Sequence, residues 1–174
     1  MKCGAVLFLV GFSVLSISSQ AMEVKGLVIG QAVTEQGLAD IFGSASCPGA
    51  GALVAEQLAK IDVVRCTVPI SFLGIQASAK VYIMEGRAAN LWIPVPAQSL
   101  TDIEDMFTKK YGAPTTDRPA AAARKKKNKW PGSVCSDWRN VDGGNISVCE
   151  GSGSSSSAVQ FTYAAPTKID ESDI

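Results

Sequence analysis

The chain has no histidine among its 174 residues, which removes the commonest general base of enzymes. Without imidazole, neither a Ser-His nor a Cys-His nucleophile pair can form, and most zinc sites lose a ligand. Ser78 and Lys80 are one residue too close for a Ser-x-x-Lys motif. No glycine-rich phosphate loop opens a strand-helix unit. We therefore expect no catalytic residue, no nucleotide, no metal and no cofactor.

Long apolar runs are confined to the start of the chain. Lys2 precedes an apolar core from Ala5 to Ile17, and Ser19-Gln20-Ala21 gives a small-x-small cleavage site. The pattern predicts a bacterial Sec-type signal peptide over residues 1–21 and a periplasmic or secreted protein. The alternative, an uncleaved membrane anchor, needs a longer apolar core than this one. We expect no transmembrane segment in the mature chain.

About 150 residues follow the predicted signal peptide, enough for one domain with its own core. Lys2 leaves with the signal peptide, so 15 basic and 16 acidic residues remain in the mature chain. This balance indicates neither a nucleic-acid nor a membrane partner. We assign residues 22–165 to a single α+β domain containing a flexible basic loop at 115–130, and 166–174 to a disordered tail.

Four cysteines remain in the predicted mature chain: Cys47, Cys66, Cys135 and Cys149. An even number in an exported chain predicts two disulfides, with three possible connectivities. Because local pairs form most easily, we expect Cys47–Cys66 and Cys135–Cys149. The second pair has a difficulty, since a turn centred on Gly143-Gly144 sets Cys135 opposite Ser152. Either a glycine bulge shifts the register, or Cys135 precedes its strand.

Residues 78–114 carry the clearest structural signal. Apolar residues alternate over 79–84 and again over 91–95, around a turn at 85–87, which predicts an antiparallel hairpin. Thr101 and Glu104 match a capping box at the start of a helix that ends at Gly112. The apolar stripe of this helix is predicted to cover the hairpin.

The remaining segments complete an α+β fold, with helices packed on one face of a mostly antiparallel sheet. No internal repeat is visible in the sequence. The other predicted elements are a strand at 24–29, helices at 34–42 and 52–61, an edge strand at 65–72 that contains Pro69, strands at 134–141 and 146–150, and a last strand around 159–163.

Two groups of charged residues are candidate sites. Asp102, Glu104 and Asp105 can be read as an acid/base set, but their position in the first turn of a helix on a solvated face already explains them. The basic run, for which the candidate residues are Arg124, Lys125, Lys126, Lys127 and Lys129 with Trp130 beside them, can dock an anionic partner. The alternative is a solvated, mobile loop.

Tyr82 and Trp92 are candidate contact aromatics, because interfaces concentrate such residues. Both point away from the apolar positions of their predicted strands. If the helix at 101–112 covers the apolar side, the two rings lie on an open sheet face. The alternative is that the first two helices bury them.

Two short stretches resemble known exported proteins. The segment from Gly30 to Gly43 is similar to the opening of small bacterial envelope proteins, and Tyr111-Gly112-Ala113-Pro114 resembles a helix ending of exported proteins with helices on an antiparallel sheet. The layout resembles that of SmpA/OmlA-type outer-membrane assembly lipoproteins and of β-lactamase-inhibitory proteins, although no lipid-acceptor cysteine is present.

The resemblance implies a non-catalytic domain whose sheet and loops bind another protein. We expect a periplasmic or secreted binding domain that acts as an inhibitor, immunity factor or adaptor. An envelope structural or assembly factor is the alternative. A histidine-free hydrolase is a third possibility, which a cleft with two convergent carboxylates would support.

Overall fold

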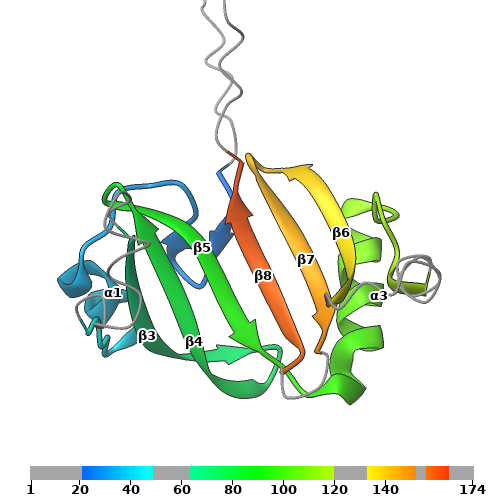
Figure 1. Cartoon of the computed structure of the whole chain (residues 1–174), viewed down its shortest axis with the longest axis horizontal. Helices are drawn as coiled ribbons and strands as arrows, with labels where there is room; N and C mark the ends of the chain where they lie inside the picture. The colour runs from blue at the N-terminus through cyan, green and yellow to red at the C-terminus, as the bar shows by residue number, and fades with distance from the viewer. Residues whose placement is uncertain (1–20, 49–62, 120–132, 152–155, 165–174) are drawn as a thin grey trace, which may run out of the picture.

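A six-stranded antiparallel sheet forms the centre of the protein (Figure 1), in the order β3-β4-β5-β8-β7-β6. The computed structural model describes residues 21–48, 63–119, 133–151 and 156–164. Disulfides, antiparallel sheet and helices together confirm the predicted single α+β domain. The strands are β3 (Val63–Phe72), β4 (Ile75–Met84), β5 (Arg87–Pro94), β6 (Val134–Val141), β7 (Gly144–Glu150) and β8 (Ala158–Tyr163).

One face of this sheet is covered by the remaining elements, which lie behind it in Figure 1. The predicted strand at 24–29 is a small two-stranded hairpin that packs across the middle of the sheet. The helices lie at the two ends, α1 beside β3 and α3 against β6 and β7. The bounds are β1 (Glu23–Val24), β2 (Leu27–Val28), α1 (Glu35–Phe42), the 3₁₀ turn η1 (Ala97–Ser99) and α3 (Leu100–Tyr111).

The layout repeats although the sequence shows no repeat. Helix α1 precedes the meander β3-β4-β5, and helix α3 precedes the meander β6-β7-β8. The last strand of each meander, β5 and β8, pairs with the other at the centre of the sheet. The sheet is therefore built from two similarly ordered halves that meet at one antiparallel seam.

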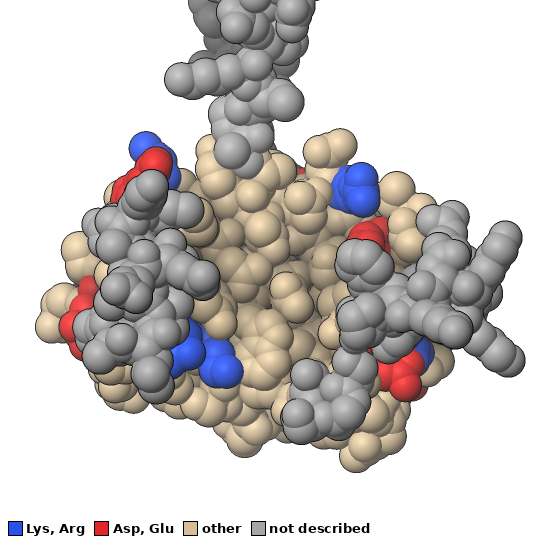
Figure 2. Space-filling view, in the orientation of Figure 1, with Lys and Arg blue, Asp and Glu red and all other residues tan. Residues whose placement is uncertain are grey.

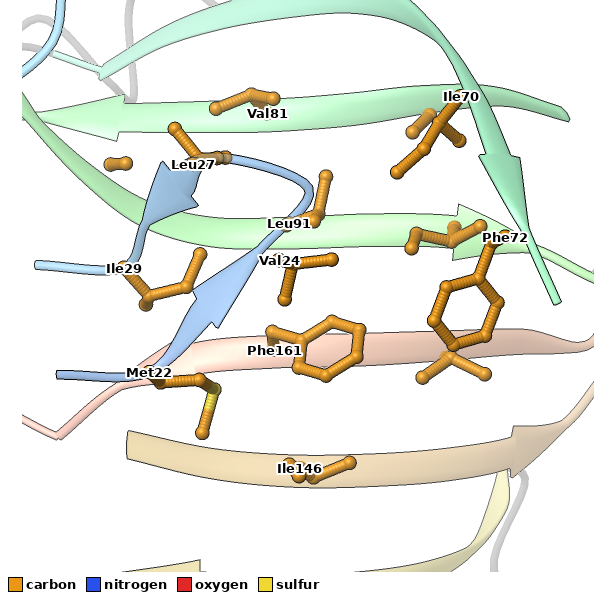
Figure 3. Close-up of a cluster of buried hydrophobic side chains, with 14 of the residues drawn as sticks. Met22, Val24, Leu27, Ile29, Ile70, Phe72, Val81, Leu91, Ile146 and Phe161 are labelled. Carbon is orange, nitrogen blue, oxygen red and sulfur yellow. The ribbon is translucent and has the colours of Figure 1, made fainter. Parts of the chain in front are cut away.

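The core fills the space between the sheet and the small hairpin. Met22, Val24, Leu27 and Ile29 are all buried and lie over the inward side chains of the sheet, including Phe161 (Figure 3). Strand β3 crosses toward the seam at its end, so that Phe72 makes an edge-on contact with Phe161 at 6.0 Å.

Helix α3 corrects two predictions. Its stripe is buried at Ile103 and Phe107, but it packs on β6 and β7, because β1 and β2 already cover the β4-β5 hairpin. The Thr101–Glu104 capping box is also wrong. The helix continues from η1 and begins at Leu100 after Ser99, so Thr101 lies inside it. By contrast, α1 agrees with the helix predicted at 34–42 to within one residue, with Thr34 as its N-cap and Gly43 as its C-cap.

Both predicted disulfides form, between Cys47 and Cys66 and between Cys135 and Cys149. The register difficulty is resolved by two features of the β6-β7 hairpin. Its turn is Asp142-Gly143 rather than Gly143-Gly144, and a bulge between Trp138 and Val141 shifts the pairing by one residue. Cys135 and Cys149 are consequently direct cross-strand partners.

Four hairpins close through two-residue turns in which both residues have positive φ, as type I′ turns require. The first residue of such a turn is usually Asn, Asp or Gly, whose left-handed conformation is least costly. Only one turn follows this preference. The turns are Lys25-Gly26, Leu73-Gly74, Glu85-Gly86 and Asp142-Gly143.

Each outer strand of the sheet is bridged by the segment that follows the preceding helix. Ser46 exchanges two backbone hydrogen bonds with Thr67 of β3, of 2.9 and 2.7 Å. Thr116 makes the corresponding bridge to Asp137 of β6. Pro69 also lies on β3, as predicted for an edge strand.

Several predictions fall outside the described residues: the signal peptide, the helix at 52–61, the basic run with Trp130, and the tail at 166–174. Among the helices that are described, none combines the length and the apolarity that a membrane crossing requires.

Candidate binding face

The sheet has a second face that no described element covers, and we call it the open face. It is turned toward the viewer in Figures 1 and 2. Tyr82 and Trp92 both lie on it and are half-buried, opposite the buried Val81, Ile83, Leu91 and Ile93. The structure therefore places both predicted aromatics on the side of the sheet opposite the described helices, whereas the alternative, burial by the first two predicted helices, involves residues 52–61, which lie outside the described residues.

Strand register arranges this face into rows of neighbouring side chains. One row crosses all six strands and contains Trp92, and we call it the Trp92 row. Because each member is a direct cross-strand partner of the next, their side chains lie side by side. In order from β3 to β6, the row is Thr67, Lys80, Trp92, Gln160, Ser147 and Asp137.

A parallel row, the Tyr82 row, lies two residues further along the strands. It consists of Arg65, Tyr82, Asn90, Thr162 and Asn145. A bulge in the β4-β5 pairing, between Tyr82 and Ile83, borders the row on one side. The two rows together form a band that contains aromatic, amide and hydroxyl groups on the open face.

Contacts within the band fix several of these side chains. The Asn90 amide donates to the Thr162 hydroxyl at 2.8 Å, and the Ser147 hydroxyl donates to the Asp137 carboxylate at 2.6 Å. The Lys80 ammonium lies 4.6 Å from the centroid of the Trp92 ring, a cation–π distance. A surface that is already ordered loses less entropy when it binds a partner.

Charge is distributed unevenly over the open face. Its central part carries no Lys, Arg, Asp or Glu, and the charged side chains gather toward the two sides (Figure 2). On the rows themselves, Arg65 and Lys80 occupy the β3-β4 side, and Asp137 occupies the β6 side. Along the two rows, the uncharged centre thus lies between a basic side and an acidic side.

A second polar cluster lies at the β6 end, on the face that carries the helices. The Arg118 guanidinium forms two hydrogen bonds of 3.0 Å to the Glu104 carboxylate and one of 3.2 Å to Glu150. The Ser136 hydroxyl donates to Glu104 at 2.7 Å and accepts from the Arg118 backbone N–H at 2.8 Å. The hydrogen bonds from Glu104, with a smaller contribution from Glu150, raise the pKa of Arg118 above its usual value.

This cluster corrects the interpretation of Glu104 as a solvated helix residue, since its side chain is only 16% exposed. Glu104 and Glu150 do converge from separate elements, the arrangement named above for a hydrolase. However, the Arg118 guanidinium lies between them and bonds to both. Two carboxylates bonded to one guanidinium act as hydrogen-bond acceptors that hold it in place. The cluster fastens the segment after α3 to the sheet.

Sequence reasoning missed the amide and hydroxyl members of the open face, Asn90, Gln160, Thr162 and Ser147. Each alternates with buried residues of its strand, so period-two patterning could have placed them on this face. Their proximity to Tyr82 and Trp92 depends on the β5-β8 and β7-β8 pairings, which join distant segments. Of the predicted contact residues, the structure brings together only Tyr82 and Trp92, because the basic run is not described.

The residues that the structure describes contain no group of three or more His, Cys, Asp or Glu placed to hold a metal ion. A comparison with known protein families, with curated proteins and with solved structures finds no match to this chain.

Proposed function

We propose that this protein is a non-catalytic, exported domain that binds another protein through the open face of its sheet. The observation that carries the proposal is the band formed by the Trp92 and Tyr82 rows. Aromatic rings are among the groups that interfaces concentrate, and here ordered amides and hydroxyls beside the half-buried rings can supply hydrogen bonds. An inhibitor, immunity factor or adaptor would use such a face.

The rigidity of the support favours the same function. The sheet is one continuous antiparallel ladder, and a disulfide on the open face joins β6 to β7. Binding sites built on strands hold their side chains more precisely than sites on loops. A preformed face of this kind suits a partner that docks with little rearrangement.

Export is the second part of the proposal. The two disulfides are consistent with an oxidising compartment. Met22, the first residue after the predicted cleavage site, is only 4% exposed, and its backbone N–H donates to the Asp142 carbonyl at 2.8 Å. Met22, directly after the predicted cleavage site, therefore belongs to the folded core.

Capture of a partner from the exported fraction tests the binding proposal. Immobilised wild-type domain should retain a partner that the Tyr82→Ala/Trp92→Ala double variant does not retain. Asp102→Ala on the outer surface of α3 is the matched control and should bind like wild type.

Because the aromatics are half-buried, the double variant must keep its disulfides and cooperative unfolding. Ser78→Tyr gives an independent check, since Ser78 is exposed on the open face and its change leaves the core intact. Binding that survives both variants would contradict the proposal. A membrane complex as the captured species would favour the envelope assembly factor over an inhibitor or adaptor.

A further inference from the structure

One end of the open face is hollowed. The hollow has a volume of about 410 Å³ and is lined by Lys80, Trp92, Ser133, Cys149, Ser156, Ala158 and Gln160. This volume lies within the range of pockets that take small ligands. Trp92 forms one wall, and the disulfide and Ala158 contribute the neighbouring part of the face.

Lys80 is the one charged residue among the described residues that line this hollow. In the part of the chain that the structure covers, its ammonium meets the Trp92 ring and no carboxylate. The aromatic ring orients the cation but leaves its charge unneutralised. Arg65, in the adjacent row, adds positive charge on the same side.

The hollow also contains a poorly satisfied donor. The Gln160 side-chain amide donates to the Cys149 sulfur at 4.0 Å, and sulfur is a weak acceptor. The Ser133 and Ser156 hydroxyls line the same space. A cation, an amide donor and two hydroxyls around one hollow are complementary to an anionic acceptor with two oxygens.

We infer that the hollow receives the carboxylate of an Asp or Glu side chain from the partner protein, with Lys80 pairing to it and Gln160 donating a hydrogen bond. This inference rests on the proposed function and specifies the chemistry of the partner. The acidic residue would be the anchor of the interface, and the uncharged band beside it would contact the surrounding residues. Lys80 and Gln160 therefore determine specificity for an acidic segment.

The test is an NMR titration of the full oxidised domain with the capped peptide Ac-Gly-Glu-Asp-Glu-Gly-NH2. The Trp92 indole N–H is the readout, assigned with Trp92→Phe. We expect saturable shifts at low salt that weaken as salt is added. The peptide Ac-Gly-Gln-Asn-Gln-Gly-NH2, of the same shape without charge, should bind at least tenfold more weakly.

Lys80→Gln should weaken the acidic peptide about tenfold, whereas Lys109→Gln, the same charge change on exposed α3, should leave it unchanged. The inference would be overturned if both variants lost the same affinity for the acidic peptide, or if the uncharged peptide bound as tightly as the acidic one. It would also be overturned if inorganic phosphate shifted the Trp92 indole N–H as much as the acidic peptide does. Partner capture that depends on Trp92 but not on Lys80 would also overturn it, while leaving the proposed function standing.

Discussion

Leu73 is the residue whose backbone conformation most conflicts with its side chain. It is the first residue of the β3-β4 turn, with φ of 51°, and its side chain is 50% exposed. A left-handed conformation costs an ordinary L-residue roughly 1–2 kcal/mol, but much less for Asn, whose short polar side chain can bond locally. Leu73→Asn should therefore relieve about 1 kcal/mol of backbone strain.

Leu73→Asn and the wild-type protein should have similar stability, because the buried half of the leucine also contributes to the free energy of unfolding. Full burial of a leucine is worth about 1.5–3 kcal/mol, so half of it contributes about 1 kcal/mol and offsets the relief of strain. Leu73→Ala removes that contribution and keeps the strain. We therefore expect Leu73→Asn to be about 1 kcal/mol more stable than Leu73→Ala, which is roughly 3 °C in Tm for a domain of this size.

The assay is thermal or guanidinium unfolding of both variants with the disulfides intact. Ser78 supplies the matched control, since it is exposed and has the extended backbone of a strand. Ser78→Asn should have no advantage over Ser78→Ala, because asparagine is disfavoured in strands. An equal stability of the two Leu73 variants would refute the assignment of strain to this turn.

The remaining predictions concern the supports of the sheet. Arg118→Ala should lower the free energy of unfolding by about 1–3 kcal/mol. It should also speed hydrogen exchange of the Asp137 backbone N–H, which donates a hydrogen bond to the Thr116 carbonyl. Unchanged exchange would show that Arg118 does not hold this segment. Replacing Cys47 and Cys66 with serine should cost about 3 kcal/mol and speed exchange of the Thr67 amide, whereas replacing Cys135 and Cys149 should leave that amide protected. Gly144→Ala should cost about 1–3 kcal/mol, since its Cβ would lie 2.8 Å from the Thr162 carbonyl oxygen and 2.8 Å from Met22 Cε. Gly37→Ala, where a Cβ meets nothing closer than 3.4 Å, should instead stabilise α1 by about 0.5–1 kcal/mol, and the opposite order would contradict the packing described.

Local patterns in the sequence predicted most of the elements. Alternation placed the strands, and Thr34 and Gly43 marked the ends of α1. The capping box failed because the chain enters α3 through η1, so the residues before Thr101 are already helical. Glu104 was misread for a related reason, since its partner Arg118 comes from a later segment and only the folded chain brings them together.

Only part of the open face could be predicted from the sequence. Tyr82 and Trp92 could be placed on one side of their strands by period two, but their neighbours come from β8 and β7. Register also depends on backbone detail that composition does not carry. The turn at Asp142-Gly143 moved the partner of Cys135 from Ser152 to Glu150, and the single-residue bulge before Val141 moved it by one more place to Cys149. The long-range pairings and this bulge are what the sequence alone could not supply.

The bridges at the two outer strands determine how other molecules can approach. The segment at Ser46 is tied to β3 by the adjoining Cys47–Cys66 bond, and the segment at Thr116 is tied to β6 through Arg118. An incoming strand could pair along the whole of either border only after it displaced the bridge there. The two bridges therefore hinder growth into a continuous sheet with further copies at either flank.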